Sequence, residues 1–277
     1  CCVRNELVRL PFFLDYYRSK GVARFFFIDN DSSDGTLEFL LSQKNDVCVY
    51  QTRDSYANAR YGIFWFKYLL DQYGYGKWCL LIDSDEILIY PRWEETSLKG
   101  LCHFFTSEHR TGFKADLLDM YGKGLPPLQI SLSRPLWEVF PYFDTPRSPH
   151  FFTIPPGKKF FGGVRKRVFD VSACLEKIPL FKYGRAVDIL VGIHDVSGVD
   201  LSSIHGALLH FKFDSLFLER AKSEANRLEH WRGALEYKRY VEVASQWKDA
   251  SLYSDEYSVL FKNSEQLLDL GIMQSTD

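Results

Sequence analysis

The sequence feature that most constrains the fold is an apolar run that ends abruptly in three acids. Residues 78–82 are apolar without interruption, as expected of a strand buried on both faces of an α/β sheet. Asp83, Asp85 and Glu86 follow closely. Carboxylates crowded at the end of a buried strand repel one another and lose hydration, so they need a compensating charge. Mg²⁺ or Mn²⁺ suits such oxygen ligands, and an exposed turn with hydrated acids is the alternative.

Apolar runs and helical segments alternate through the first third of the chain. This order predicts an α/β fold with a mostly parallel central sheet flanked by helices, whose ligand site lies beyond the carboxyl ends of the strands. The strands before the acidic run are expected over residues 1–3, 25–28 and 47–51, and the helices over about 7–21, 36–44 and 56–73. Acids gather where the strands end: Asp29, Asp31, Asp54, Asp83 and Asp85.

Composition and charge narrow the class of protein. The 277 residues carry a formal net charge of −2, so no basic field favours nucleic acid as a partner. The six cysteines form no Cys-x-x-Cys pair, which speaks against a zinc site and for a reducing compartment. No signal peptide or apolar run of about 18 residues is present, so we expect a cytoplasmic protein, with a peripheral position at the membrane face as the alternative. The chain starts without Met, which we interpret as a sign that other domains of a longer polypeptide accompany it.

Three other ligand-binding motifs do not fit the sequence. The acidic segment from Asp29 onward is not a calcium-binding EF-hand loop, because its twelfth position is Leu40 instead of an acid. No Gly-x-Gly-x-x-Gly pattern and no Walker lysine follows the first strand. Dinucleotide and P-loop phosphate binding are therefore not supported.

The chain resembles a known family at the ends of three expected strands. Asn5 and Glu6 follow the first strand, the segment IDNDSSDGT spans residues 28–36 after the second, and Asp83-Ser84-Asp85 follows the apolar run. This layout is similar to that of GT-A fold glycosyltransferases of the family-2-like group that carries an Asp-x-Asp motif. The segment around Arg60 resembles a further family-2 segment. The resemblance covers residues 1–120 well and the rest loosely.

The resemblance implies a GT-A architecture with a Rossmann-like nucleotide-binding half. Residues 1–120 would bind the nucleotide sugar, residues 121–214 would complete the sheet and face the acceptor, and residues 215–277 would form C-terminal helices. The implied reaction moves a sugar from a UDP-, GDP- or dTDP-sugar donor to a glycan or other carbohydrate-type acceptor. Mn²⁺ or Mg²⁺ is the implied cofactor, since it neutralises charge that develops on a diphosphate leaving group.

The resemblance also assigns residues to the site. Asp83 and Asp85 would hold the metal, with His210 at the end of a late apolar run as third ligand and His194 as its rival. Asp29 and Asp54 would lie near the base and ribose, although turn capping is the alternative interpretation of Asp29. The further donor-binding positions would be Asn5, Glu6, Asp31, Arg60 and Ser84.

The second half of the chain holds the candidates for acid–base chemistry. The pattern over residues 112–119 predicts another strand. An inverting transferase needs a carboxylate that takes the proton of the acceptor hydroxyl. Asp119, at the end of that strand, is the first choice, with Glu138 and Asp144 as alternatives. The Glu-Asp pair that family-2 enzymes carry after Gly-Gly is missing after Gly162-Gly163. A proline-rich stretch over residues 124–156 is expected to shape the acceptor side.

Two further features lie in the second half of the chain: a basic segment and a set of apolar residues at helical spacing. Residues 158–167 contain five cations, among which Arg165 and Lys166 are candidates for phosphate binding, and a solvated basic turn is the alternative. Beyond residue 215 the pattern is helical, and an apolar stripe there is typical of core or of a face that meets a partner. Its members are Phe217, Ala221, Ala225, Leu228 and Trp231.

Two rival functions fit parts of the pattern. A nucleotidyltransferase shares the general fold and the metal chemistry, but the glycine-rich, arginine-containing loop that would hold a triphosphate is missing after the first strand. A catalytically inactive domain that binds glycans, or serves as a scaffold in a larger synthase, is the second rival. The intact Asp83 and Asp85 speak against it.

Overall fold

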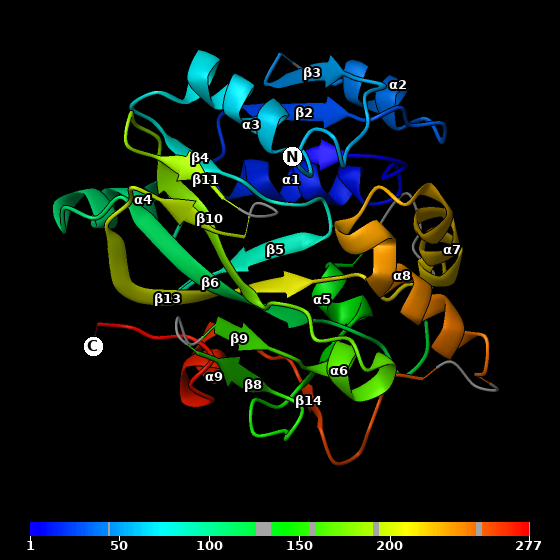
Figure 1. Ribbon diagram of the computed structural model, residues 1–277. Helices are drawn as coiled ribbons and strands as arrows, with labels where there is room; N and C mark the ends of the chain where they lie inside the picture. The colour runs from blue at the N-terminus through cyan, green and yellow to red at the C-terminus, as the bar shows by residue number, and fades with distance from the viewer. Residues whose placement is uncertain (44, 126–133, 156–158, 191–193, 248–250, 277) are drawn as a thin grey trace.

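A three-stranded parallel sheet forms from the first segments of the chain. The computed structural model describes residues 1–43, 45–125, 134–155, 159–190, 194–247 and 251–276. Strands β1 (Cys2–Val3), β2 (Phe25–Asp29) and β3 (Val47–Gln51) lie in the order β1-β2-β3 and run parallel (Figure 1). These strands and their direction confirm the α/β pattern expected from the sequence.

The helices between these strands are shorter than expected. Helix α1 (Leu10–Ser19) starts with Pro11 in its first turn, where a proline costs no hydrogen bond. Helix α2 spans Thr36–Leu41, and α3 spans Ile63–Leu69 before a π-helical turn, η1 (Leu70–Gly74). The expected helix over 56–73 begins late because Arg60, Tyr61 and Gly62 have φ of 52°, 58° and 79°. A left-handed run of this kind cannot be part of a right-handed helix.

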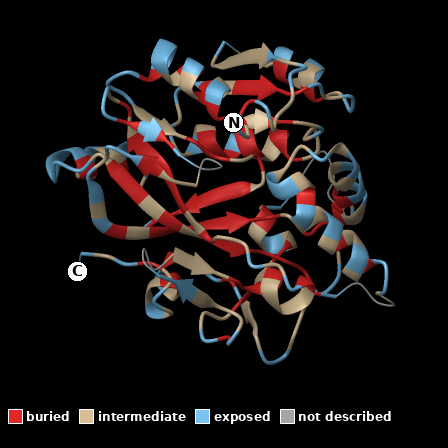
Figure 2. Cartoon of the chain, viewed as in Figure 1, coloured by how far each residue is buried: buried red, intermediate tan, exposed pale blue. Residues whose placement is uncertain are grey.

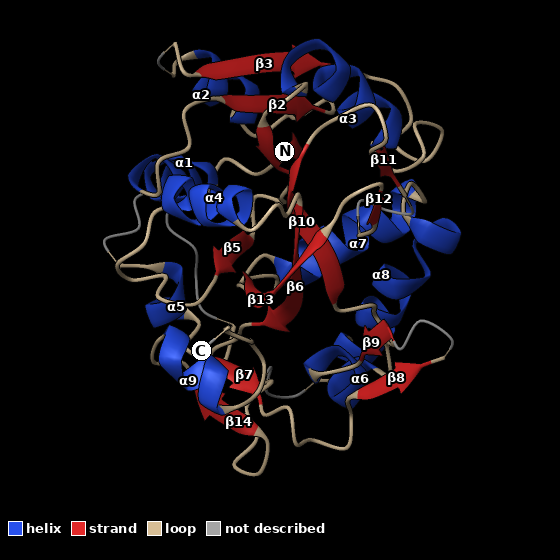
Figure 3. Cartoon of the chain, turned by 90° about the vertical axis from the view of Figure 1, so that its left-hand side faces the viewer, coloured by secondary structure: helices blue, strands red, loops and turns tan. Residues whose placement is uncertain are grey.

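The second sheet has five strands and is mixed. Its order is β4-β10-β6-β13-β5, in which β6 and β13 pair in parallel and the other three neighbouring pairs are antiparallel. Figure 3 shows β10, β6 and β13 crossing the middle of the molecule. The strands are β4 (Trp78–Leu80), β5 (Glu86–Ile89), β6 (Gly112–Asp119), β10 (Glu176–Lys182) and β13 (Leu201–His210).

The expectation of a mostly parallel sheet holds for the first sheet and is wrong for the second. The apolar run at 78–82 was expected to be a central parallel strand buried on both faces. Instead β4 is half-buried at one end of the five-stranded order and pairs antiparallel with β10. An apolar run indicates burial, but it does not encode the direction of the strand beside it.

Smaller elements surround the two sheets. The C-terminal part is mainly helical, as expected, but it also contributes strand β14, which pairs with β7. The helices are α4 (Leu98–Ser107), α5 (Leu136–Val139), α6 (Val164–Phe169), α7 (Phe217–Arg227), α8 (Trp231–Ala244) and α9 (Ser264–Asp269). The short strands are β7 (Tyr142–Asp144), β8 (Phe152–Ile154), β9 (Lys159–Phe161), β11 (Asp188–Ile189), β12 (Val196–Ser197) and β14 (Ser258–Leu260).

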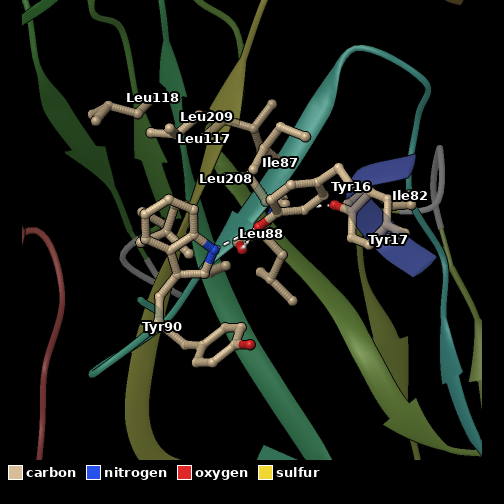
Figure 4. Packing of buried hydrophobic residues seen from close by; sticks show 14 of the residues in the cluster. Tyr16, Tyr17, Ile82, Ile87, Leu88, Tyr90, Leu117, Leu118, Leu208 and Leu209 are labelled. Atoms are coloured by element: carbon tan, nitrogen blue, oxygen red, sulfur yellow. Dashed lines mark hydrogen bonds between the residues drawn. The ribbon is translucent and has the colours of Figure 1, made fainter. Parts of the chain in front are cut away.

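In the core, helix α1 packs against strand β5, directly beside the acidic loop (residues 83–86). Buried residues line the central strands (Figure 2), and the rings of Tyr16 and Tyr17 pack against Leu88 and its neighbours (Figure 4). The Tyr17 hydroxyl donates to the carbonyl of Glu86 at 3.1 Å and accepts from the amide of Leu88 at 3.1 Å. Because each buried aromatic ring removes on the order of 200 Å² from water, this packing holds the start of β5 in one place.

Candidate functional site

Three residues singled out from the sequence meet where β13, β6 and the acidic loop come together. His210 ends β13 and is directly opposite Asp119 of β6. Its Nε2 lies 3.4 Å from Oδ2 of Asp85, and its Nδ1 lies 2.6 Å from Oδ1 of Asp119. The amide of Phe211 also donates to the carbonyl of Asp85 at 2.8 Å, which fixes the loop against β13. The imidazole therefore bridges two carboxylates that lie 34 positions apart in the sequence.

The electrostatics of this group are set by burial and by close opposite charges. Burial alone would lower the pKa of His210, but Asp85 and Asp119 outweigh it and raise the pKa to about 9. Burial alone would raise the pKa of Asp85, yet His210 and Arg9 hold it well below its usual range. Without a metal, the imidazole therefore carries a proton at neutral pH between two ionised carboxylates.

A buried lysine compensates the other two acids of the loop. The Lys177 side chain is fully buried, and its Nζ lies 3.0 Å from Oδ2 of Asp83 and 2.7 Å from Oε2 of Glu86. The same Glu86 oxygen accepts from the amide of Asp83 at 3.1 Å. From the sequence we expected a divalent cation to do this work, and Lys177 had no role. The useful signal is a lysine at the start of an apolar strand, since a buried lysine nearly always has an acidic partner.

The geometry of Asp85 and His210 fits one divalent cation. Two neighbouring ligands of an octahedral ion that each lie about 2.1 Å from the metal are about 3 Å apart, close to the 3.4 Å between Asp85 and His210. An imidazole that bonds a carboxylate through its other nitrogen is typical of metal-binding histidines. Asp83, two positions before Asp85, has a partly exposed carboxylate whose Oδ2 is bonded to Lys177. Within the described ranges, no group of three or more His, Cys, Asp or Glu side chains is arranged so that it could hold a metal ion.

Asp29 lies buried at the end of β2 with one oxygen unpaired. Its Oδ2 accepts from the amide of Ser32 at 3.3 Å, while Oδ1 has no hydrogen-bond partner among the residues that the structure describes. Next to it, Asn30 donates to the carbonyls of Thr52 and Asp54 at 3.3 and 3.0 Å. Asn30 thereby holds the loop after β3, and the Asp54 side chain remains exposed.

Hydrogen bonds join the loop after β1 to the loop after β2. Oδ1 of Asn5 accepts from the amide of Ser33 at 2.8 Å, and the amide of Asn5 donates to Oγ of Ser32 at 3.0 Å. Glu6 pairs with Arg9 at 2.7 Å, and burial raises the pKa of its carboxyl. Asp31 is half exposed and lies 3.4 Å from Arg53. Asn5, Glu6 and Asp31 therefore surround the same loop as Asp29.

Three of the predicted donor-binding residues lie apart from the acidic loop in their contacts. No contact between described residues joins the side chain of Arg60, Ser84 or Lys166 to an acid of that loop. Arg60 is exposed over the ring of Phe64, and Ser84 is buried inside the acidic loop. Lys166 bonds Asp170 on the helix surface. The four described cations of the basic segment pair with acids of the protein: Lys159 with Asp195, Arg165 with Asp119, Lys166 with Asp170 and Arg167 with Asp144. Lys158 lies outside the described residues.

The three candidate general bases differ in how many of their carboxylate oxygens already accept hydrogen bonds from the protein. Asp119 has Oδ1 on His210 and Oδ2 on Nε of Arg165 at 2.7 Å, and Arg165 and His210 lower its pKa against the effect of burial. Asp144 has both oxygens on Arg167, at 2.8 and 2.9 Å. This geometry argues against either as a general base. Glu138 is exposed beside an open pocket of about 350 Å³ next to Tyr142. Residues 126–133 and 156 of the proline-rich stretch lie outside the described part of the chain.

The rival histidine has a different environment. Nδ1 of His194 donates to the carbonyl of Glu176 at 3.0 Å, and burial lowers its pKa to about 4. A neutral imidazole with one nitrogen on a backbone carbonyl is a satisfied structural group. The structure therefore favours His210 over His194 as the partner of Asp85.

The connection between α7 and α8 reaches the loop after β3, which the sequence did not indicate. Oε2 of Glu229 accepts from Oγ of Ser55 and from the amide of Ala57, at 2.6 and 2.8 Å. Arg227 donates to Oδ1 of Asn30 at 3.1 Å. The expected apolar stripe is core at Phe217 and Ala221, but Leu228 and Trp231 are 50% and 59% exposed. Polar neighbours around Trp231 were the signal that this part of the stripe faces solvent.

Comparisons with known proteins add no family to this picture. No protein-family model matches the chain, and no curated protein matches it either. Among the residues that the structure describes, none of the helices has the length and apolarity that a membrane crossing requires.

Proposed function

We propose that the protein is a glycosyltransferase of GT-A type that depends on a divalent metal ion. It moves a sugar from a nucleoside-diphosphate donor to a carbohydrate-type acceptor. The observation that carries this proposal is the pair formed by Asp85 and His210, at 3.4 Å, where the end of β13 meets the loop before β5. The parallel sheet β1-β2-β3 and the polar loops at its carboxyl edge support a nucleotide site beside this pair.

Asp85 and His210, together with Asp83, are the residues that would hold Mn²⁺ or Mg²⁺. The ion, when bound, stabilises negative charge on the diphosphate as the sugar leaves. Asp83 stays in place because Lys177 fixes one of its oxygens, and Tyr17 fixes the strand that follows the loop. The site is thus organised before a donor arrives, which is the condition for electrostatic stabilisation of a transition state.

Asp29 is the residue that recognises the nucleobase in this proposal. A buried carboxylate oxygen without a partner costs about 1–3 kcal/mol, and a ring N–H of a base would satisfy it. Asn30 and Glu229 hold the adjoining loop through the carbonyl of Asp54 and the hydroxyl of Ser55. We place the activity in the cytoplasm, where the six free cysteines would stay reduced, with a peripheral membrane position as the alternative.

Binding of nucleotides with and without Mn²⁺ tests the proposal. UDP, GDP or dTDP at 100 times its dissociation constant should stabilise the protein by about 2.7 kcal/mol, and the matching nucleotide sugar should be hydrolysed slowly when Mn²⁺ is present. Asp85→Ala and His210→Ala should abolish the Mn²⁺-dependent part of both signals. Asp170→Ala, which alters an exposed ion pair, serves as control.

Three outcomes would contradict the proposed function. Stabilisation by a nucleoside triphosphate with a sugar phosphate, and by no nucleoside diphosphate, would indicate a nucleotidyltransferase. Glycan binding without donor binding would indicate an inactive glycan-binding or scaffold domain. Donor hydrolysis that survives Asp85→Ala would show that the Asp85–His210 pair does not carry the reaction.

A further inference from the structure

We infer that Asp119 and Arg165 are positioning residues that hold the imidazole of His210 with Nε2 turned toward Asp85. This inference rests on the proposed function, because it concerns the same site. It gives Asp119 a task other than that of general base, and it gives Arg165 a task other than phosphate binding.

The parallel pairing of β6 and β13 sets the distance between the two side chains. Asp119 and His210 are register partners at the ends of their strands, and both are buried. Oδ1 of Asp119 is 2.6 Å from Nδ1 of His210, which is a short, charge-assisted contact. Rotation of the imidazole about its side-chain bonds would break this contact. Nε2 is consequently the nitrogen that faces Asp85, at 3.4 Å.

Arg165 holds Asp119 from the opposite side. Its Nε donates to Oδ2 of Asp119 at 2.7 Å, and both side chains are at most 6% exposed. Arg165 comes from α6 and also approaches Glu236 of α8, with Nη1 3.6 Å from Oε1. A guanidinium offers several donors in a fixed plane, so it can orient a carboxylate in a way that a lysine cannot. Asp119 is therefore held at both oxygens.

This arrangement matches the requirements of a metal-binding histidine. A carboxylate on the far nitrogen fixes the ring orientation and the tautomer, and it makes the near nitrogen a better ligand. A general base, in contrast, needs an oxygen that can reach the acceptor hydroxyl. Asp119 has neither oxygen free, so its position suits orientation of His210 and not proton transfer from an acceptor.

Mn²⁺ affinity of the whole chain, measured by electron paramagnetic resonance without nucleotide, tests the inference. Loss of such a partner typically weakens metal binding about 10- to 100-fold, and we expect this loss in Asp119→Asn. Asp46→Asn is the control, because it breaks the contacts of 2.8 and 3.1 Å with Arg18 at the amino end of β3, away from the loops at the carboxyl edge. Its Mn²⁺ affinity should equal that of the wild type.

A double variant separates positioning from stability. Asp119→Asn leaves the Arg165 guanidinium buried without its carboxylate, which is destabilising, whereas Asp119→Asn with Arg165→Met removes both charges. We expect the double variant to regain unfolding free energy and to keep the weak Mn²⁺ affinity. Recovery of wild-type affinity in the double variant would show that Asp119 acts through stability alone, and would overturn the inference.

Nuclear magnetic resonance of the metal-free protein gives a readout that is independent of metal binding. The Nδ1 proton of His210 should resonate far downfield in the wild type and in Asp46→Asn, and this signal should be lost in Asp119→Asn and in His210→Ala. A downfield proton that persists in Asp119→Asn would overturn the inference. If the signal depends on Asp119 but the wild type binds no Mn²⁺, the positioning contact is supported and the proposed metal-dependent function fails.

Discussion

Lys177 shows how a single residue can change the interpretation of an acidic loop. The crowding of Asp83, Asp85 and Glu86 was visible in the sequence, and so was the need for a positive charge. The sequence could not reveal that a lysine 91 positions after Glu86 supplies part of that charge, because the contact exists only once β10 pairs with β4. The sequence singled out both Asp85 and His210, but they meet for another reason than expected: Asp85 directly precedes β5, whose first residue pairs antiparallel with His210.

Lys177→Met should destabilise the protein strongly. The change leaves Glu86 and Asp83 without their buried cation, and removal of one partner of a buried ion pair typically costs about 3–5 kcal/mol. Urea denaturation followed by tryptophan fluorescence measures the loss. Lys177→Met combined with Glu86→Gln should recover part of it, because the second change removes the unpaired buried charge. An unchanged unfolding free energy in Lys177→Met would refute the role assigned to Lys177.

His194 predicts a specific loss of stability in acid. Its pKa is about 4 in the folded protein and 6.5 ordinarily, so the unfolded chain takes up a proton that the folded chain refuses. Stability from this residue is therefore complete above pH 6.5 and is lost as the pH falls toward 4, by about 3 kcal/mol in total. His194→Gln should flatten the stability profile over that interval. An identical pH dependence in the variant and the wild type would contradict the assignment.

At the scale of the element, the sequence pattern located the strands more reliably than it predicted which strands pair and in which direction. The bounds of β3 and β6 agree with the expected segments 47–51 and 112–119. Helix α3 begins late because its amino-terminal turn is left-handed, and no periodicity reports φ. The direction of β4 could not be predicted either, since its partner β10 follows about a hundred residues later and an apolar run fits either direction.

The close packing around strand β13 requires a glycine, Gly206, near the middle of the strand. A Cβ atom added to Gly206 would lie 2.5 Å from Cζ of Phe113 and 2.7 Å from the carbonyl oxygen of Ile89. Gly206→Ala should therefore cost about 1–3 kcal/mol through overpacking and weaken Mn²⁺ binding through a shift of His210. Gly184→Ala, where a Cβ meets nothing within 4 Å, is the control. Equal stability of the two variants would show that β13 tolerates displacement.

On the scale of the whole molecule, the candidate site is assembled from segments that are far apart in the sequence. The loops after β1, β2 and β3 come from the first sixty residues, the acidic loop and Asp119 from the next sixty, and His210 and Glu229 from the last third. Local motifs mark the first group in the sequence, so these loops could be singled out before the fold was known. The sequence could not predict that α7 and α8 close over that group, since Glu229 and Ser55 are joined by tertiary packing alone.

The parallel pairing of β6 and β13 has a consequence for biosynthesis. Parallel neighbours need a crossover connection, and here residues 120–200 form it. A ribosome that adds about 5–20 residues per second therefore exposes Asp83 and Asp85 several seconds before His210 emerges. Strand β13 lies between β6 and β5 in the sheet, so neither of these two strands can make its native pairing with it before residues 201–210 have been made. The pairing of Asp85 with His210 is therefore among the last contacts of the site that synthesis allows.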